Sequence, residues 1–591
     1  MMKKSKLKAV GLSLVSLFVL SACQGGQQTQ EEADPVDVSA LPIVVSNTDE
    51  PIEGGTLDVG MVTDSAFTNM LYLEFSSDTY DGQLMGPIRE GIFSADENFG
   101  ITDEGIVKMD LDVEGRSVTL RIQEEVRWSD GTDLTADDLI YSYEVLGHPD
   151  YPGVRFTEEV RNVVGIEEYH NGDVDSISGI TKVDDQTITI EYKEVNPGHL
   201  QLGGGIWNGA LPKHYLEHLE VSEMEASDEV RLQPVHYGPY VVETVTPGEA
   251  ITYVPNEHYY GGTPNLENIR ISVVPDTSIV EALKVQDYDI VLSMPTGNYD
   301  VYSVIPNYEY LGRLDYAYTY LGFKLGTLNE ETGEVEPNES AKMANKNLRQ
   351  AMGYALDNDG VAERFYHGLR SRGTTLIPPV FPVFHDESQL GFPQDKEKAR
   401  ELLAEAGYED VTGDGFVEDP EGNELVINFA SMSGGGDIAQ PMTENYIQEW
   451  ADVGLNVELA TGRLIDFQSF YDKLKADDPE IDIFEAAWAT GAEPSPGKFY
   501  GRNAAFNYTR YASEEHDELL QKINSKEAFD LEYRKTAFAD WQSYANEQAY
   551  VIPTLYRNAI LPVHNRVTGW DWNYHTENNW LTVGVTTESR D

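Results

Sequence analysis

Residues 128–138 read Trp-Ser-Asp-Gly-Thr-Asp-Leu-Thr-Ala-Asp-Asp, a tight turn followed directly by the start of a helix. Asp130-Gly131 is a typical turn pair. Thr135 is a good N-cap, and acidic residues occupy the first helical turn behind it. The apolar residues that follow have helical spacing: Leu139, Tyr143 and Leu146. The stretch therefore predicts a turn that leads into an amphipathic helix.

Strand and helix patterns alternate on both sides of this stretch. Apolar and polar residues alternate along 109–113 and 118–122, which predicts a hairpin with one buried face. A Pro247-Gly248 turn between 240–245 and 251–254 predicts a second hairpin. Apolar residues recur at helical spacing at two later places, residues 348–356 and 399–406. Short strands mixed with short helices predict an α/β body rather than a barrel or a helix bundle.

Four of these segments together resemble the signature motifs of one protein family. They are 128–138, 238–262 (Gly-Pro-Tyr followed by Asn-Glu-His-Tyr-Tyr-Gly-Gly), 348–357 and 399–408. Their order and spacing are similar to those of the large solute-binding proteins of oligopeptide and dipeptide ABC importers, of the lipid-anchored Gram-positive type. The resemblance extends from about residue 56 to residue 565. Most of the motif residues form turns and helices, so they indicate the family and not the ligand.

The resemblance implies a two-lobed, periplasmic-binding-protein-like α/β fold (type II, large) with an extra subdomain in the first lobe. We expect the first lobe at 56–310, completed by 560–591, and the second lobe at 311–559. The chain is expected to cross between the lobes at 318–324 and 550–555. A hinge at these crossings would close the lobes around a ligand.

The N-terminus has the pattern of an export signal. Four lysines precede an apolar run, 9–20, whose twelve residues span only about 18 Å as a helix, too short for a membrane core. The run ends in Leu20-Ser21-Ala22-Cys23, which resembles a bacterial lipobox. We therefore predict a signal peptide at 1–22, lipidation of Cys23, a flexible stalk at 23–55, and a location on the extracellular face of the cell membrane. The alternative is a chance buried thiol, although Cys23 is the only cysteine.

Charge excludes one class of partner. The chain has 41 basic and 102 acidic residues, a formal net charge of −61. Nucleic acids repel such a surface, because their binding requires clustered Lys and Arg. The acidic residues are spread along the chain, which favours a solvating surface that faces the outside medium. We expect a monomer that contacts the membrane only through its lipid anchor and its permease.

The resemblance also implies a ligand site. Peptide-binding members hold an extended peptide between the lobes and anchor its α-amino group with an Asp that follows a tryptophan. Here Glu493 stands in that place after Trp488, and its longer side chain leaves the anchoring open. Further candidate ligand-binding residues, each with a structural role as the alternative, are Asn507, Tyr508 for stacking, Arg510 for a carboxylate, and the backbone of Ser433 and Gly434.

One motif suggests a metal. Residues 410–421 nearly reproduce an EF-hand loop and offer Asp410, Thr412, Asp414, the Phe416 carbonyl, Glu418 and Glu421 as oxygen ligands for a structural Ca²⁺. The alternative is a plain hairpin turn between a helix and a strand. We expect no other cofactor.

The predicted function is capture of oligopeptides and their delivery to an ABC permease. The sequence lacks the motifs of metalloproteases, serine hydrolases and P-loop NTPases, so no enzyme activity is expected. Within the same fold, the ligand alternatives are a peptide pheromone, a sugar, nickel or haem. The rivals from other classes are a secreted lipoprotein hydrolase of peptides or cell-wall fragments, and an adhesin.

Overall fold

The computed structural model describes residues 38–63, 66–123, 125–329, 331–433, 438–576 and 579–590. The predicted signal peptide, the lipidation site Cys23, the first part of the predicted stalk and the candidate Gly434 lie outside the described residues. Within the described residues, no helix is both long enough and apolar enough to span a membrane.

The first lobe is built around parallel strands whose apolar residues are buried, as is usual for strands covered on both faces. The C-terminal residues pack back onto it, with Trp570, Val583 and Val585 in its core. Its elements are η1 (Val38–Ala40), β1 (Thr56–Val62), α1 (Thr79–Met85), β6 (Tyr240–Thr246), β7 (Ala250–Pro255), β8 (Asn268–Val274), α8 (Asp276–Lys284), β9 (Ile290–Leu292), α9 (Tyr299–Tyr302), β18 (Val567–Thr568), α18 (Asn579–Thr582) and β19 (Gly584–Val585).

The extra subdomain has its own core and its own antiparallel sheet, with strand order β2-β3-β5-β4. The helix predicted after Thr135 is present, and the Thr135 backbone N–H donates to Asp138 Oδ2 at 2.9 Å. The elements are β2 (Val107–Asp112), β3 (Ser117–Ile122), α2 (Ala136–Leu146), α3 (Glu158–Arg161), α4 (Ile166–His170), β4 (Ile180–Asp184), β5 (Thr187–Glu191), η2 (Pro197–Leu200), α5 (Lys213–Leu216), α6 (Val221–Met224) and α7 (Asp228–Arg231).

The second lobe packs helices on both faces of its strands around a large aromatic core that includes Trp450 and Trp541. The predicted helix after Asp395 is present, and Asp395 accepts a hydrogen bond from the Lys398 backbone N–H at 2.9 Å. The elements are β11 (Gly326–Asn329), β12 (Glu334–Pro337), α10 (Lys346–Ala355), α11 (Asn358–Tyr366), β13 (Arg370–Arg372), α12 (Lys396–Glu405), β14 (Val426–Ala430), α13 (Ala439–Ala451), β15 (Asn456–Leu459), α14 (Phe467–Lys475), β16 (Ile483–Ala489), α15 (Gly497–Tyr500), α16 (Glu514–Ile523), η4 (Lys526–Phe529) and α17 (Leu531–Gln548).

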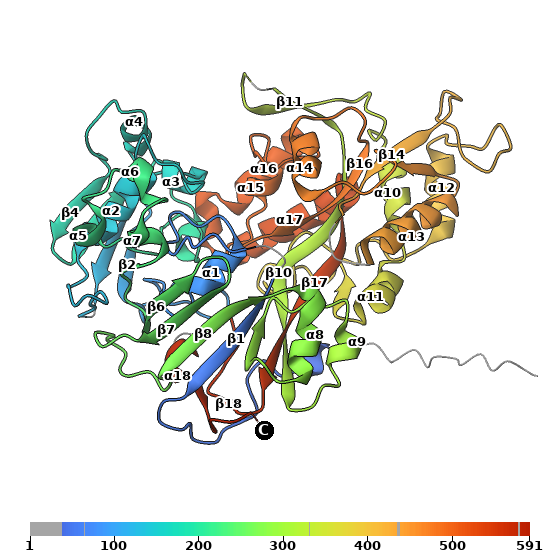
Figure 1. Cartoon of the computed structure of the whole chain (residues 1–591). Coiled ribbons are helices and arrows are strands. Elements are labelled where there is room, and N and C mark those ends of the chain that lie inside the picture. Colours follow the sequence, from blue (N-terminus) through green and yellow to red (C-terminus); the bar gives the residue numbers. More distant parts are fainter. Residues whose placement is uncertain are drawn as a thin grey trace, which may run out of the picture. The chain divides into compact units, whose positions relative to one another are not determined.

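Two long strands, β10 (Tyr308–Phe323) and β17 (Val551–His564), connect the lobes and lie side by side (Figure 1). They join the strands of both lobes into one sheet of order β15-β14-β16-β10-β17-β9-β1-β8-β7-β6, with β13 also paired to β17. Residues 308–314 lie opposite 558–564, and residues 318–322 lie opposite 551–556. The register shifts between Leu314 and Tyr318, which is where the pair passes from the first-lobe core to the second-lobe core. The lobe boundaries given from the sequence stay a prediction.

The stalk prediction is wrong for residues 38–55. This segment lies against the first lobe: Val45 is buried, and the Ile52 backbone N–H donates to the Val585 carbonyl at 2.9 Å. Val44 also forms a bridge with Asp571. Burying the apolar residues 41–45 against the first lobe is more favourable in free energy than exposing them to water in a flexible stalk.

Candidate functional site

The parallel strands of both lobes end where the lobes meet. In β16, Ile483 lies opposite Phe323 and Ala489 opposite Ala317, so the strand runs toward the first lobe, with β14 and β15 parallel to it. In the first lobe, β9 is antiparallel to β17, and β1 and β8 share the direction of β9. The carboxyl ends of the two sets of strands therefore face each other. Open α/β sheets bind ligands outside these ends, which makes the region between them the candidate site.

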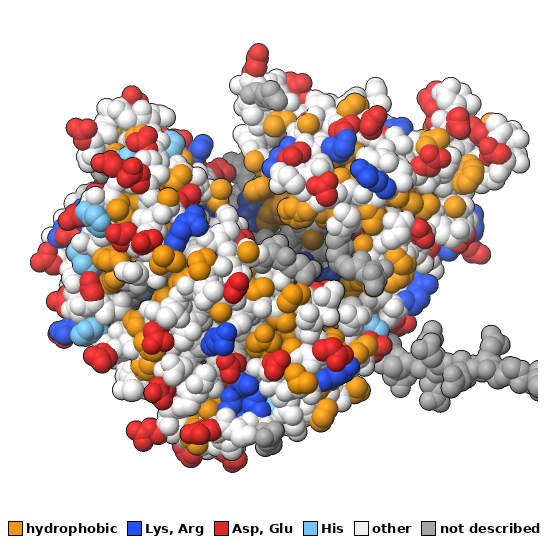
Figure 2. Space-filling model, viewed as in Figure 1, with side chains coloured by type: hydrophobic (Ala, Val, Ile, Leu, Met, Phe, Trp, Pro, Cys, Tyr) orange, Lys and Arg blue, Asp and Glu red, His pale blue; other side chains and the backbone are white. Residues whose placement is uncertain are grey.

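In Figure 2, the surface is hollowed between the extra subdomain and the second lobe, and hydrophobic side chains lie along the second-lobe wall of this hollow. Trp488, near the carboxyl end of β16, packs against four aromatic rings, with centroids 5.0 Å away for Phe499, 5.3 Å for Phe506, 5.8 Å for Tyr508 and 6.2 Å for Tyr320. Phe506 is 47% exposed, whereas Tyr508 is buried, and burial raises the pKa of Tyr508 to about 12. Trp488 and Phe506 thus form an aromatic surface, and the buried ring of Tyr508 packs against both of them.

Asn507 and Arg510 lie within the second lobe. Asn507 Nδ2 donates to three backbone carbonyls, which fixes the turn around it. Arg510 is 1% exposed and donates from Nε to Asp477 Oδ1 at 2.7 Å. Lys324 Nζ lies 2.6 Å from the same oxygen. The position of Arg510 therefore supports a structural role, not the predicted contact with a ligand carboxylate.

Ser433 follows β14 at the candidate site and is exposed. Its backbone N–H already donates to the Ile465 carbonyl at 2.8 Å, so it is not available for a ligand in this arrangement. The other backbone donor proposed in this loop, that of Gly434, lies outside the described residues.

Glu493 lies at the candidate site, in the loop between β16 and α15, but its carboxylate has partners within the protein. Arg534 Nη2 donates to Oε1 at 2.9 Å, and the Ser495 backbone N–H donates to Oε2 at 3.0 Å. The side chains of Glu493 and Arg534 are 8% and 4% exposed. Burial lowers the pKa of Arg534, and the charge of Glu493 opposes that shift. Glu493 is thus one half of a buried ion pair.

Two arginines outside the predicted set of ligand-binding residues lie side by side near the boundary between the lobes. Arg370 in β13 and Arg557 in β17 are opposite residues of an antiparallel pair, so both side chains leave the same face of the sheet. Leu369 packs in a first-lobe cluster, whereas Tyr366 packs in the second-lobe cluster. The guanidinium of Arg370 stacks on the Tyr366 ring at 3.7 Å. Among the described residues, neither guanidinium makes a hydrogen bond or an ion pair.

Glu485 of β16 is the buried acid near this pair. It is 9% exposed, and within the described chain its carboxylate makes no hydrogen bond. Burial raises its pKa to about 7, against the opposing charge of Arg370. The adjacent positive charges of Arg370 and Arg557 are therefore unfavourable, because like charges repel each other and buried charges are normally paired. Arg557 is the one arginine or lysine in the mostly apolar strand β17, and this is the sequence signal that could have pointed to it.

Comparisons with known proteins identify this architecture. Residues 107–509 match the family described as bacterial extracellular solute-binding proteins, family 5. The chain belongs to this family. It is 31% identical to the oligopeptide-binding protein OppA of Lactococcus lactis subsp. cremoris, over 99% of both chains, and 22% identical to the oligopeptide-binding protein AppA of Bacillus subtilis, over 98% of this chain and 99% of that one.

Solved structures agree with the family 5 assignment. Lactococcal OppA, complexed with an endogenous peptide in the closed conformation, superposes with a TM-score of 0.79 and 31% identity over 90% of this chain and all of that one. Bacillus subtilis AppA in complex with a nonapeptide superposes with a TM-score of 0.68 and 19% identity over 91% of this chain and all of that one. The predicted two-lobed solute-binding fold is thereby confirmed. Members of this family are binding proteins of the extracellular side.

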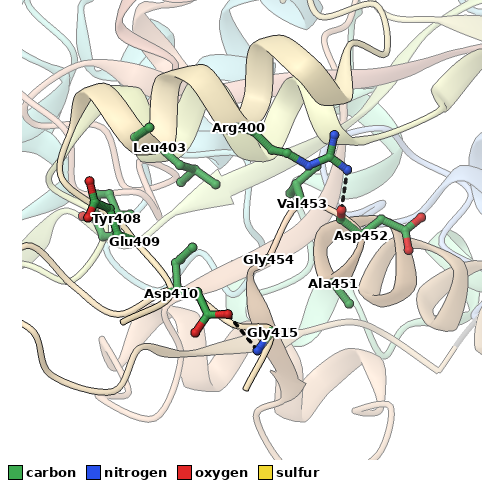
Figure 3. Close-up of a pocket in the computed structure, with 12 residues that line it drawn as sticks. Arg400, Leu403, Tyr408, Glu409, Asp410, Gly415, Ala451, Asp452, Val453 and Gly454 are labelled. Atoms are coloured by element: carbon green, nitrogen blue, oxygen red, sulfur yellow. Dashed lines mark hydrogen bonds between the residues drawn. The ribbon is translucent and has the colours of Figure 1, made fainter. Parts of the chain in front are cut away.

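The EF-hand-like loop of this family 5 protein precedes β14 and so lies at the far end of the second lobe from the candidate site. The carboxylate oxygens of Asp410, Asp414 and Glu418 lie within 4.8 Å of one another. Glu421, predicted as a ligand, is not part of this group, because it belongs to the following turn. In Figure 3, Asp410 accepts a hydrogen bond from the Gly415 backbone N–H, at 3.0 Å. The hairpin alternative accounts for such bonds equally well.

Calcium at this loop stays a prediction with a direct test. We expect millimolar CaCl₂ to raise the melting temperature, because a ligand at a hundred times its Kd stabilises the folded state by about 2.7 kcal/mol. Asp414→Asn is expected to abolish the shift, whereas Glu421→Gln, outside the carboxylate group, keeps it. An unchanged melting temperature for the unaltered protein in CaCl₂ would contradict the prediction.

Proposed function

We propose that this protein is the extracellular substrate-binding subunit of an ABC importer, which captures oligopeptides between its two lobes and delivers them to a membrane permease. The observation that carries the proposal is the pair of opposed strand ends, with an aromatic surface at one of them and two arginines near the lobe boundary, in a chain similar over its full length to oligopeptide-binding proteins. An extended peptide suits such a site, because main-chain hydrogen bonds to a peptide do not depend on its sequence.

The two chemical features of the site suit different parts of a peptide. Trp488 and Phe506 offer flat apolar surface to a side chain, which gains from leaving water. Arg370 and Arg557 offer adjacent donors to a carboxylate, the partner that arginine binds best. In this proposal the arginines take over the role that the sequence suggested for Arg510.

Native mass spectrometry of the mature protein, purified without denaturation, tests the proposal. We expect a heterogeneous mass increment that resolves into assorted short peptides after denaturation. A single discrete increment would indicate one dedicated ligand, such as a pheromone or a sugar, and would overturn broad peptide capture. A protein without ligand that then fails to bind a random peptide pool in calorimetry would overturn it as well.

A hydrolase is the rival from another class. We propose that the protein binds peptides without cleaving them, because ATP-driven transport needs an intact ligand and the sequence offers no known hydrolase motif. Incubation of the purified protein with the same peptide pool, followed by mass spectrometry, should return every peptide intact. Turnover of any peptide in proportion to protein concentration and time would favour the hydrolase.

Arg557→Gln tests the arginine pair. We expect peptide affinity to fall by about tenfold or more, because a charge-assisted hydrogen bond is lost. The free energy of unfolding should stay level or rise slightly, because the substitution removes a like-charge neighbour of Arg370. Arg364→Gln on the exposed face of α11 is the matched control and should bind as before. Unchanged affinity of the Arg557→Gln protein would remove the pair from the site.

The membrane anchor is a separate proposal that rests on the lipobox-like sequence at Cys23. Cys23→Ser is expected to move the protein from the membrane fraction to the medium, because the substitution removes the predicted site of acylation. Immunoblots of both fractions measure this, with radiolabelled palmitate as a check on acylation. Retention of the Cys23→Ser protein in the membrane fraction would contradict the proposal.

A further inference from the structure

The residue in the amine-anchoring position is engaged by the protein itself. Glu493 Oε1 accepts from Arg534 Nη2 and from the Ser495 hydroxyl, and Oε2 accepts from the Ser495 backbone N–H. With 7% of its surface exposed, Glu493 has both oxygens occupied in a nearly dry environment. An ammonium group would have to displace Arg534 to reach this carboxylate.

Several groups of the protein contact Arg534, so its displacement from Glu493 is unfavourable. It comes from α17, and its guanidinium lies 5.1 Å from the Phe384 ring and 5.5 Å from the Phe538 ring. Its Nη1 donates to Gln201 Oε1 at 2.9 Å. Removing the partner of a buried charge is strongly unfavourable, because the charge that remains is neither solvated nor neutralised. Exchange of Arg534 for a peptide amine therefore gains little.

Gln201 makes this contact an inter-lobe one. It follows η2 in the extra subdomain, is 7% exposed, and forms a β-bridge with Gly100 that fixes its backbone. Nearby, Lys526 of η4 forms an ion pair with Glu114 of the extra subdomain. Glu493, Arg534 and Gln201 thus form a chain of hydrogen bonds that exists only while the second lobe and the extra subdomain are in contact.

We infer that Glu493, Arg534 and Gln201 form a polar latch between the second lobe and the extra subdomain, and that the protein consequently recognises peptides without using their α-amino group. This inference rests on the proposed peptide-binding function. It defines the ligand class more narrowly: peptides with blocked amino termini bind as well as free ones, and a peptide can bind through an internal segment.

The test uses the unaltered protein and an equimolar pool of random synthetic nonapeptides, one half N-acetylated. Peptides retained by the protein are quantified by mass spectrometry. We expect acetylated and free forms to be retained in a ratio within about twofold of one. Depletion of the acetylated form by tenfold or more, the cost of a lost charge-assisted bond, would overturn the inference. Retention of no peptide at all would instead overturn the proposed function.

A variant separates the two interpretations of Glu493. In Glu493→Gln the latch is weakened, and the acetylated-to-free ratio is expected to stay near one, because no amine depends on the carboxylate. If the unaltered protein prefers free amines and the variant loses that preference, Glu493 is the anchor after all. Gln201→Ala, far from any amine in this scheme, is expected to open the lobes, which small-angle scattering detects as a larger radius of gyration without ligand. An unchanged radius would contradict the latch.

Discussion

Replacing Asp477 by asparagine is expected to lower the free energy of unfolding by about 3–5 kcal/mol, the usual cost of removing one partner from a buried charge cluster. Asp477 holds two cations, with Lys324 Nζ at 2.6 Å and Arg510 Nε at 2.7 Å. The side chains of the three residues are 11%, 10% and 1% exposed. Without the carboxylate, two neighbouring positive charges remain out of water.

Urea unfolding followed by circular dichroism measures this loss. Asp472→Asn on the exposed face of α14, the helix that precedes Asp477, is the matched control and should change stability by about 0.5 kcal/mol or less. An equally small loss for Asp477→Asn would show that the cluster is well solvated.

The cluster also predicts a pH dependence. Burial alone raises the pKa of Asp477, but Lys324 and Arg510 outweigh it and hold the pKa below its ordinary value. A carboxyl with a lowered folded-state pKa contributes stability above its unfolded pKa of about 3.9, and that stability is lost as pH falls through the lower folded value. The stability difference between the unaltered protein and Asp477→Asn should therefore be constant above about pH 5 and shrink in stronger acid.

Asp289→Asn is expected to cost a similar amount, about 3–5 kcal/mol. Asp289 is fully buried and accepts from Arg566 at 2.6 Å and 2.7 Å and from Arg590 at 2.9 Å through both oxygens. Arg566 in turn donates to the carbonyls of Thr587 and Glu588. The same carboxylate therefore stabilises the first lobe and holds the C-terminal residues against it.

Two measurements together check this prediction. Urea unfolding gives the stability, and carboxypeptidase digestion followed by mass spectrometry reports release of the C-terminus. Asp287→Asn, exposed and two residues earlier, is the matched control and should resist trimming as the unaltered protein does. A C-terminus that stays protected in Asp289→Asn would show that the other contacts of the first lobe suffice to hold it.

Local sequence determined the elements whose causes lie within a few residues. Thr135 begins its helix because a carboxylate three residues on accepts its backbone N–H, and Asp395 begins another because its own carboxylate accepts the backbone N–H three residues on. The hairpins at β2-β3 and β6-β7 follow from alternation and turn residues. The order of the motifs along the chain was enough to identify the family and, with it, the two-lobed fold, which the comparisons confirm.

Tertiary structure alone decided which charged groups are free to meet a ligand. Position after Trp488 suggested Glu493 as an amine anchor, but Arg534, 41 residues away, occupies that carboxylate and also donates to Gln201. Arg510 is the residue type that binds a carboxylate ligand, but it forms a buried ion pair with Asp477 inside the second lobe. Strand pairing instead places Arg370 beside Arg557. The reason is physical: a charge is satisfied by whatever group lies within about 3 Å, and that neighbour is set by packing between distant segments, which local sequence does not encode.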